Sequence, residues 1–449
     1  MTTPPAPLQA DRAHAQVTDA RRAAAEICAD LRRGELLDPA FEARATVLDA
    51  RDRRWLQELA FGMLRRRAAL DARIAPRVTG GLARLDPDVV DLLRLGAYQL
   101  LHMRSVPPYA AIAQTVELVK TRHGIGASRL ANAVLRRLDR ERDEATPAPA
   151  DPVEALALQY SHPRWLVARW IARWGADDTA RLLAANDREP PTVLRAYGVV
   201  PEQLEAMLES AGVATHHSAL VPGSLEVTGG AALVETGAYR QGHFFVQDPG
   251  ATLVTRYAAI PAGARVADLC AAPGGKTLEL SRTASRVIAC DRSAARMTRL
   301  VQNVARVDAK NVHAVIADAR HPAVRDMDAV LIDAPCTGTG TLRRHPDARW
   351  RLKPSDLAVM GALQRALLRA AAPAVRAGGL LIYSTCSLEP EENDAQVESF
   401  LADLQGAFAL EPPPDGAVDA STLDAGRLRV LPQRHGVDGA FAARLRRVA

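Results

Sequence analysis

Alternation between buried apolar runs and helical patterns, from about residue 264 onward, constrains the fold of this chain more than any other feature. Helical segments such as AARMTRLVQNVAR (294–306) separate the apolar runs. Five such runs fit buried strands: RVADLC (265–270), RVIACD (286–291), HAVIAD (313–318), AVLIDAP (329–335) and GLLIYSTC (379–386). This alternation is typical of a parallel sheet covered by helices on both faces. We predict a Rossmann-like α/β domain with a mostly parallel sheet over residues 246–449.

The first part of the chain has a different pattern, with apolar residues at helical spacings of three and four throughout residues 10–142. Glycine and proline pairs such as Gly80-Gly81 and Pro107-Pro108 separate the segments. We predict an all-helical domain over residues 1–145, followed by the Ala- and Pro-rich linker EATPAPADP (144–152). Residues 146–245 mix helical and strand-like pieces and predict a small α+β middle segment, so the chain as a whole is multidomain.

Composition excludes several classes of protein. With 449 residues and 48% hydrophobic residues, the chain contains no apolar run of the ~18 residues that a membrane span requires. The first residues, MTTPPAPLQADRAHAQ, include no hydrophobic signal segment, so we expect a cytoplasmic protein without a membrane partner. Five scattered cysteines without a CxxC pair predict neither a disulfide framework nor a metal site.

Charge gives a first indication of a partner. The net charge is +5, and the whole basic excess lies within residues 1–145. A basic excess confined to one segment suits a polyanion such as nucleic acid. Solvated helix faces explain the charge equally well, so charge alone does not decide.

The first apolar run ends in DLCAAPGGKT (268–277), where two glycines lie between a strand and a helix. Glycines there let the backbone approach a ligand closely, and the helix start offers free N–H groups. The segment is not a phosphate loop, because Cys270 stands where GxxxxGK[ST] requires its first glycine, and GxGxxG is absent too. Cys270 to Lys276 therefore form a tight turn suited to a ligand with a carboxylate rather than a pyrophosphate.

Three further runs end in the acids Asp291, Asp318 and Asp333. Ligands of parallel sheets bind beyond the carboxyl ends of the strands, where an acid can accept hydrogen bonds from ribose hydroxyls or an exocyclic amine. A row of carboxylates repels phosphates but tolerates a cation. S-adenosylmethionine combines a ribose, an adenine amine and a sulfonium, so we expect it as cofactor. The alternative is that the three acids simply occupy surface loops.

Two strand ends also present thiols, Cys336 in DAPC and Cys386 in STC. Cysteines are often small core residues, as we expect for Cys28 and Cys290. Beyond the strand tips, however, two thiols could share one crevice. A thiolate that attacks carbon 6 of a pyrimidine makes carbon 5 nucleophilic enough to accept a methyl group, and a second thiol can assist the later expulsion. The chemistry alone does not say which thiol attacks.

The segments DLCAAPGGKT, LIDAPCTGTG, LRRHPDARW and YSTCSLEPEEN resemble the motifs of the RNA (cytosine-5) methyltransferases. The helical N-terminal part is similar to NusB-type RNA-binding domains, and the order of parts resembles the bacterial small-subunit ribosomal RNA methyltransferase B family. The resemblance implies that Cys386 is the nucleophile, that Cys336 helps release the product, and that ribosomal RNA is the partner. The sequence leaves the oligomeric state open, and we expect a monomer.

The resemblance also implies roles in the S-adenosylmethionine pocket. Asp291 would bind the ribose, Asp318 would lie near the adenine, and Asp333 would close the pocket and face the base. The turn that lines the pocket would consist of Cys270, Ala271, Ala272, Pro273, Gly274, Gly275 and Lys276.

Two other functions remain open at this point: a non-enzymatic RNA-binding antitermination or ribosome-assembly factor, and an ATP-driven enzyme built on GGKT. In the loop RRHPDARW we expect Arg343 and Arg344 to reach RNA phosphates.

Overall fold

The structure is a computed structural model that describes residues 17–144, 147–229 and 232–448. It divides into two compact units, Met1–Ala168 and Arg169–Ala449, and each is described here by itself. Two expectations from the sequence lie outside the described residues: the missing signal segment at the start, and the domain boundary at residues 145–146. The boundary near residue 245 also stays a prediction.

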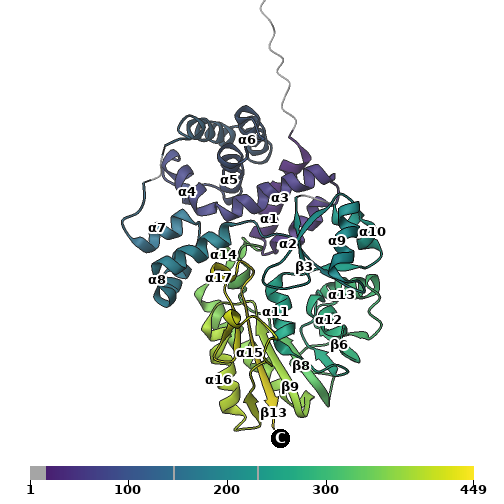
Figure 1. Ribbon diagram of the computed structural model, residues 1–449. Helices are drawn as coiled ribbons and strands as arrows, with labels where there is room; N and C mark the ends of the chain where they lie inside the picture. Colours follow the sequence, from purple (N-terminus) through teal and green to yellow (C-terminus); the bar gives the residue numbers. More distant parts are fainter. Residues whose placement is uncertain (1–16, 145–146, 230–231, 449) are drawn as a thin grey trace, which may run out of the picture. The chain divides into compact units, whose positions relative to one another are not determined.

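The first unit is helical, as the spacing of its apolar residues predicts (Figure 1). The side chain of Asp49 accepts a hydrogen bond from the backbone N–H of Asp52 and caps α3, and Asp86 caps α5 in the same way. Gly124 breaks α6 with φ of +81°. The helices in this unit are α1 (Asp19–Arg32), α2 (Leu37–Ala45), α3 (Ala50–Arg65), α4 (Arg67–Ile74), α5 (Pro87–His102), α6 (Pro108–Arg140) and α7 (Pro152–Gln159).

The second unit contains a small antiparallel sheet and a large mixed sheet. The small sheet has the order β2-β3-β1-β4 and confirms the α+β middle segment. Its strands are β1 (Val193–Ala196), β2 (Ala214–His217), β3 (Ser224–Thr228) and β4 (Phe244–Val246). The helices of this region are α8 (Arg164–Asp187), which starts in the first unit, α9 (Pro201–Ser210) and α10 (Gly237–Arg240).

The large sheet has the order β11-β12-β13-β9-β8-β5-β6-β7, with β10 beside β13. Five neighbouring strands, from β9 to β7, are parallel and confirm the Rossmann-like prediction. An antiparallel extension joins them at β9. The strands are β5 (Arg265–Asp268), β6 (Arg286–Asp291), β7 (Val312–Ile316), β8 (Met327–Asp333), β9 (Val375–Thr385), β10 (Phe408–Leu410), β11 (Leu423–Asp424), β12 (Arg427–Val430) and β13 (Ala440–Arg447).

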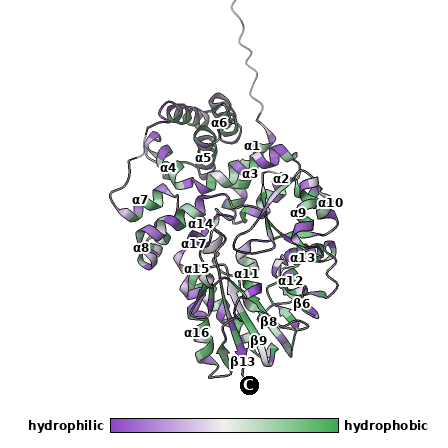
Figure 2. Cartoon of the chain, viewed as in Figure 1, coloured by the Kyte–Doolittle hydropathy of each residue, from purple (hydrophilic) through white to green (hydrophobic). Residues whose placement is uncertain are grey.

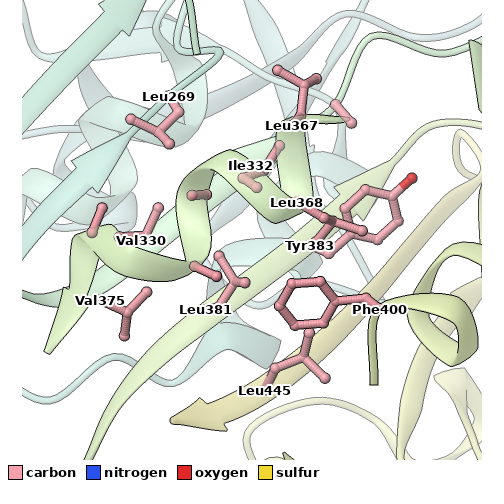
Figure 3. Close-up of a cluster of buried hydrophobic side chains, with 14 of the residues drawn as sticks. Leu269, Val330, Ile332, Leu367, Leu368, Val375, Leu381, Tyr383, Phe400 and Leu445 are labelled. Atoms are coloured by element: carbon pink, nitrogen blue, oxygen red, sulfur yellow. The ribbon is translucent and has the colours of Figure 1, made fainter. Parts of the chain in front are cut away.

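Helices cover both faces of this sheet, because side chains along β8 and β9 alternate between two apolar clusters. On one face Ile332 and Tyr383 pack with Phe400 of α16 (Figure 3). On the other face Leu331 and Ile382 belong to the cluster of α11. The helices are α11 (Pro249–Ala258), α12 (Gly275–Ser281), α13 (Ala294–Arg306), α14 (Ala348–Arg351), α15 (Pro354–Ala371), α16 (Asp394–Asp403) and α17 (Pro432–His435).

Hydrophobic residues concentrate along the central strands β8 and β9 (Figure 2). Both strands are therefore fixed by burial on two faces as well as by pairing on two edges, which makes their ends rigid supports for side chains. Across the part of the chain that the structure describes, no helix combines the length and apolar character needed to cross a membrane.

Candidate active site

Parallel pairing of β8 with β9 sets the centre of the site, because it places Asp333 directly opposite Ser384. The Ser384 hydroxyl donates a hydrogen bond of 2.8 Å to Asp333 Oδ1. Lys276, from the glycine turn after β5, donates from Nζ to Asp333 Oδ2 at 2.7 Å. The carboxylate of Asp333 is thus held from two sides, and it ties the predicted cofactor turn to the ends of β8 and β9.

The two thiols meet at the same strand ends. Cys336 follows β8, Cys386 follows β9, and their Sγ atoms lie 3.2 Å apart, within hydrogen-bond reach. Both residues are partly exposed, whereas Cys28 and Cys290 are buried core residues as expected. The backbone N–H of Gly340 donates to the carbonyl oxygen of Cys386 at 2.9 Å and connects the two loops. The placement of the thiol pair therefore fits a shared crevice better than a packing role.

The surroundings make the two thiols unequal. A hydrogen bond from Cys336 lowers the pKa of the Cys386 thiol below its ordinary value. Burial and Asp333 oppose this shift in pKa, while the nearby cations Lys276 and His345 support it. The same hydrogen bond, with burial, raises the pKa of Cys336 well above its ordinary value. Negative charge therefore resides more readily on the Cys386 sulfur, and Cys336 keeps its proton.

The glycine turn needs its glycines. Gly274 has φ of +110°, a conformation that favours glycine, and a Cβ atom there would lie 3.1 Å from Leu300 Cγ. Asp268 precedes the turn at the end of β5, is 1% exposed, and accepts a 2.7 Å hydrogen bond from the Thr277 hydroxyl. Burial raises the pKa of Asp268 to about 7, and the negative charge of Asp333 acts in the same direction.

Asp291 and Asp318 lie at the neighbouring strand ends, as predicted, but in different surroundings. Asp291 is 3% exposed and accepts hydrogen bonds from the backbone N–H groups of Ala272 (3.3 Å) and Ser293 (2.9 Å), so it contacts the turn directly. Asp318 follows β7 and pairs with Arg320 at 2.5 Å, a contact that lowers the pKa of the carboxyl. The structure thus joins Asp291 to the turn and leaves Asp318 paired with its own loop.

The turn itself packs against the sheet. Ala271 and Ala272 are buried against Met297 and Leu300 of α13. Cys270 is partly exposed, and burial raises the pKa of its thiol, with further contributions from the surrounding carboxylates. Cys270 therefore stays a neutral thiol.

The structure corrects one expectation about RNA contacts. Arg343 and Arg344 were expected to reach RNA phosphates, but their guanidinium groups pair with the carboxylates of Asp248 and Asp438. Arg343 lies 3.0 Å from Asp248, Arg344 lies 2.7 Å from Asp248 and 2.5 Å from Asp438, and Arg343 also pairs with Asp438. Because both carboxylates are less than 10% exposed, this network holds the loop in place.

Sequence reasoning missed two buried acids of the site. Asp268 stands at a strand end just as the three predicted acids do, so the same signal could have identified it. Glu392 is fully buried, and it contacts the loops of both thiols. Its segment, EPEE (389–392), contains three glutamates, of which Glu389 and Glu392 are buried, and no pattern in the sequence shows which of them contacts the thiol loops.

Comparison with known proteins agrees with this arrangement. A family model described as 16S rRNA methyltransferase RsmB/F matches residues 259–446. Another, for the NusB family, matches residues 18–140, and a third, for the RsmF/B-like ferredoxin-like domain, matches residues 162–233. The fold and the site thus define a methyltransferase that carries an additional NusB-type helical domain.

Similar proteins identify the family. The ribosomal RNA small subunit methyltransferase B of Pseudomonas putida is 33% identical over 444 residues, which cover 96% of this chain and 98% of that one. A probable ribosomal RNA small subunit methyltransferase B of Synechocystis is 34% identical over 410 residues, with 88% and 91% covered. The crystal structure of PH0851 has a TM-score of 0.80 at 29% identity and covers 95% of this chain and 98% of that chain.

The chain belongs to the ribosomal RNA small subunit methyltransferase B family. This assignment confirms the resemblance seen in the sequence and favours an enzyme over the binding-factor and ATP-driven alternatives. S-adenosylmethionine is the expected cofactor of a methyltransferase of this family.

Proposed function

We propose that this protein transfers a methyl group from S-adenosylmethionine to carbon 5 of a cytidine in small-subunit (16S) ribosomal RNA. The reaction proceeds through a transient bond between Cys386 Sγ and carbon 6 of the base. The observation that carries the proposal is the thiol pair, 3.2 Å apart at the ends of β8 and β9, with charge favoured on Cys386. Because that RNA is made and assembled into ribosomes in the cytoplasm, the proposal also places the enzyme there.

The residues of the turn fit the cofactor. Its carboxyl neighbours Asp268, Asp291 and Asp333 give the region a negative character, which suits a ligand that carries an ammonium and a sulfonium group but no phosphate. Asp268 is buried with a raised pKa, so a cation beside it would relieve an unfavourable charge. Cys270–Lys276 would hold S-adenosylmethionine, with Asp291 on the ribose and Asp318 on the adenine side, and the cofactor would supply an electrophilic methyl group.

Chemistry on the base begins with the Cys386 thiolate. Its attack on carbon 6 breaks the aromaticity of the ring, and the electron pair that reaches carbon 5 makes this atom nucleophilic towards the methyl group. After transfer, a solvent water molecule accepts the proton from carbon 5, the electron pair of that C–H bond restores the double bond between carbons 5 and 6, and the Cys386 sulfur is expelled as a thiolate. Cys336, which retains its proton, assists this expulsion from its position beside the departing sulfur.

Asp333 orients the base. Lys276 and Ser384 fix the direction of its carboxylate, which faces the same strand ends as the thiols. A fixed acceptor there can receive a hydrogen bond from the exocyclic amine of cytosine, whereas uracil offers a carbonyl oxygen in that place. This difference favours cytosine.

The test combines transfer with mapping. Purified protein is incubated with labelled S-adenosylmethionine and a small-subunit ribosomal RNA transcript, and the product is sequenced after bisulfite treatment. We expect label in the RNA and one cytidine that resists deamination. Label on a ribose, on a uridine or on another atom of cytosine would contradict the proposal.

A further inference from the structure

One buried carboxylate, that of Glu392, contacts both loops that carry the thiols. Glu392 ends the short 3₁₀ helix η6 (Pro390–Glu392) and is 0% exposed. Its Oε1 accepts the backbone N–H of Thr337 at 2.8 Å and the side-chain amide of Gln364 at 3.0 Å. Its Oε2 accepts the hydroxyl groups of Thr337 and Ser387.

These contacts reach the residues next to each thiol. Thr337 directly follows Cys336, and Ser387 directly follows Cys386. Gln364 also donates to the carbonyl oxygen of Pro335 at 2.9 Å, so the segment around Cys336 is held on both sides. The Cys336 loop and the Cys386 loop are therefore connected through a single side chain.

The energetics make this connection stiff. A buried carboxylate is unfavourable unless hydrogen bonds satisfy it, and here the four donors are all neutral groups from the two loops and α15. Movement of either loop would leave part of the charge unsatisfied. Such an arrangement favours one relative position of the two loops.

The backbone of Glu392 is itself anchored. The Tyr383 hydroxyl of β9 donates to the carbonyl oxygen of Glu392 at 2.6 Å. Three residues earlier, Glu389 accepts a 3.0 Å hydrogen bond from the indole N–H of Trp170 and pairs with Arg169. The backbone that carries the Glu392 carboxylate is therefore held in place.

We propose that Glu392 is a positioning residue that holds the sulfurs of Cys336 and Cys386 at their working separation. The effect of Glu392 on catalysis rests on the proposed function. The effect of Glu392 on the separation of the two sulfurs does not, because the proximity of two thiols can be measured without RNA or cofactor.

The first experiment measures how readily the two thiols form a disulfide. In a glutathione buffer, one oxidised glutathione accepts two electrons from the pair, so that one protein disulfide and two reduced glutathione molecules form. The full-length chain is equilibrated, alkylated and digested, and the Cys336–Cys386 peptide is quantified. The equilibrium constant of this reaction gives the effective concentration of one thiol at the other. We expect Glu392→Gln to lower this effective concentration by about tenfold or more, because the hydrogen bonds to the charged carboxylate are lost.

Glu391→Gln is the matched control. It makes the same change one residue earlier, on a 47% exposed side chain that pairs with Arg169. This control should keep the wild-type equilibrium. An effective concentration in Glu392→Gln that equals or exceeds that of Glu391→Gln overturns the proposal.

Ser387→Ala is a second, milder test of the same contacts, in case Glu392→Gln does not fold. It removes one of the four donors from the carboxylate and leaves the charge in place. It should shift the disulfide equilibrium in the same direction by a smaller factor. An unchanged equilibrium in a folded Ser387→Ala protein also counts against the positioning role.

The second experiment follows the reaction. With RNA and S-adenosylmethionine, Glu392→Gln should accumulate the covalent enzyme–RNA adduct relative to Glu391→Gln, because the releasing thiol is displaced, while the affinity for S-adenosylmethionine stays unchanged. Equal adduct levels in the two variants overturn the catalytic part. If wild-type protein itself forms neither adduct nor methylated RNA, the proposed function fails, and the disulfide measurement still decides the role of Glu392.

Discussion

At the scale of single residues, the site depends on two identical side chains in different surroundings. Cys386 has Lys276 and His345 nearby, whereas Cys336 is influenced by the negative charge of Glu392. In the proposed reaction, the attacking thiol and the assisting thiol are therefore distinguished by neighbouring charges rather than by distance from the strands. Three predictions follow from this and from the buried acid Asp268.

Replacing Cys386 should stop methyl transfer without weakening the binding of S-adenosylmethionine. We expect Cys386→Ala to abolish methyl transfer, because no other thiolate lies at the end of β9 to activate the base. Binding of S-adenosylmethionine, measured by calorimetry, should stay at the wild-type level, since the turn 270–276 is untouched. Full turnover by the variant would refute the assignment of Cys386.

Replacing the second thiol should have two effects. Cys336→Ala should trap the covalent enzyme–RNA adduct on a denaturing gel, because expulsion of Cys386 loses its assistance. It should also raise the pKa of Cys386, because the hydrogen bond that lowers this pKa is removed. The pH profile of Cys386 alkylation would then move to higher pH. Cys270→Ala serves as the control, and an unshifted profile in Cys336→Ala would exclude the hydrogen bond as the cause.

Asp268 should make the stability of the cofactor-free protein depend on pH. Its pKa is raised from 3.8 to about 7 on folding, so the folded state binds the proton more tightly. Its contribution to the free energy of unfolding is therefore present at low pH and lost as pH rises from about 4 to 7, up to about 4 kcal/mol in all. Melting temperatures of Asp268→Asn should fall less than those of wild type between pH 5 and 7. Parallel curves would contradict this.

At the scale of elements, a network of two arginines and two aspartates joins three parts of the second unit. Asp248 caps α11, Asp438 precedes β13, and Arg343 and Arg344 belong to the loop between β8 and α15. These three parts lie far apart in the sequence. The network fixes the loop that follows Cys336, and its main contribution is to stability.

Removal of one carboxylate should destabilise this unit. Asp438→Asn leaves the buried guanidinium group of Arg343 and the partly buried one of Arg344 with one carboxylate, and we expect a loss of about 3–5 kcal/mol in the free energy of unfolding. Asp424→Asn is the control, because Asp424 is 61% exposed where it pairs with Arg429 and should contribute at most about 1 kcal/mol. Urea unfolding of both variants compares the two, and equal losses would argue against a structural role for the network.

At the scale of the whole molecule, the chain combines a helical unit that includes the NusB-family region with a catalytic unit, and the basic excess belongs to the former. On α6, Arg129, Arg136 and Arg140 are exposed at helical spacing. We expect glutamate at these three positions to weaken binding of ribosomal RNA. The slope of the logarithm of the binding constant against the logarithm of the salt concentration should become shallower, by the equivalent of roughly two to three phosphate contacts. Filter binding over a salt series measures both. An unchanged slope would exclude this helix face.

The sequence was sufficient to predict those residues of the site that the topology of the sheet brings together. Parallel strands share one edge for their carboxyl ends, so Asp333, Cys336 and Cys386 could be expected to converge before any contact was known. The partners of Arg343 and Arg344 could not be predicted in that way, because they lie 94 to 96 residues away and only folding brings them together. Glu392 could not be predicted for a related reason, since only the folded structure shows which of the three glutamates contacts both thiol loops.

The pairing of β13 with β9 has a consequence for folding during synthesis of the chain. Phe441 lies opposite Thr385, the residue just before Cys386, so β9 acquires its second neighbouring strand only from residues 440–447. During translation, β9 and the Cys386 sulfur that follows it therefore gain the support of β13 only after those residues have emerged from the ribosome.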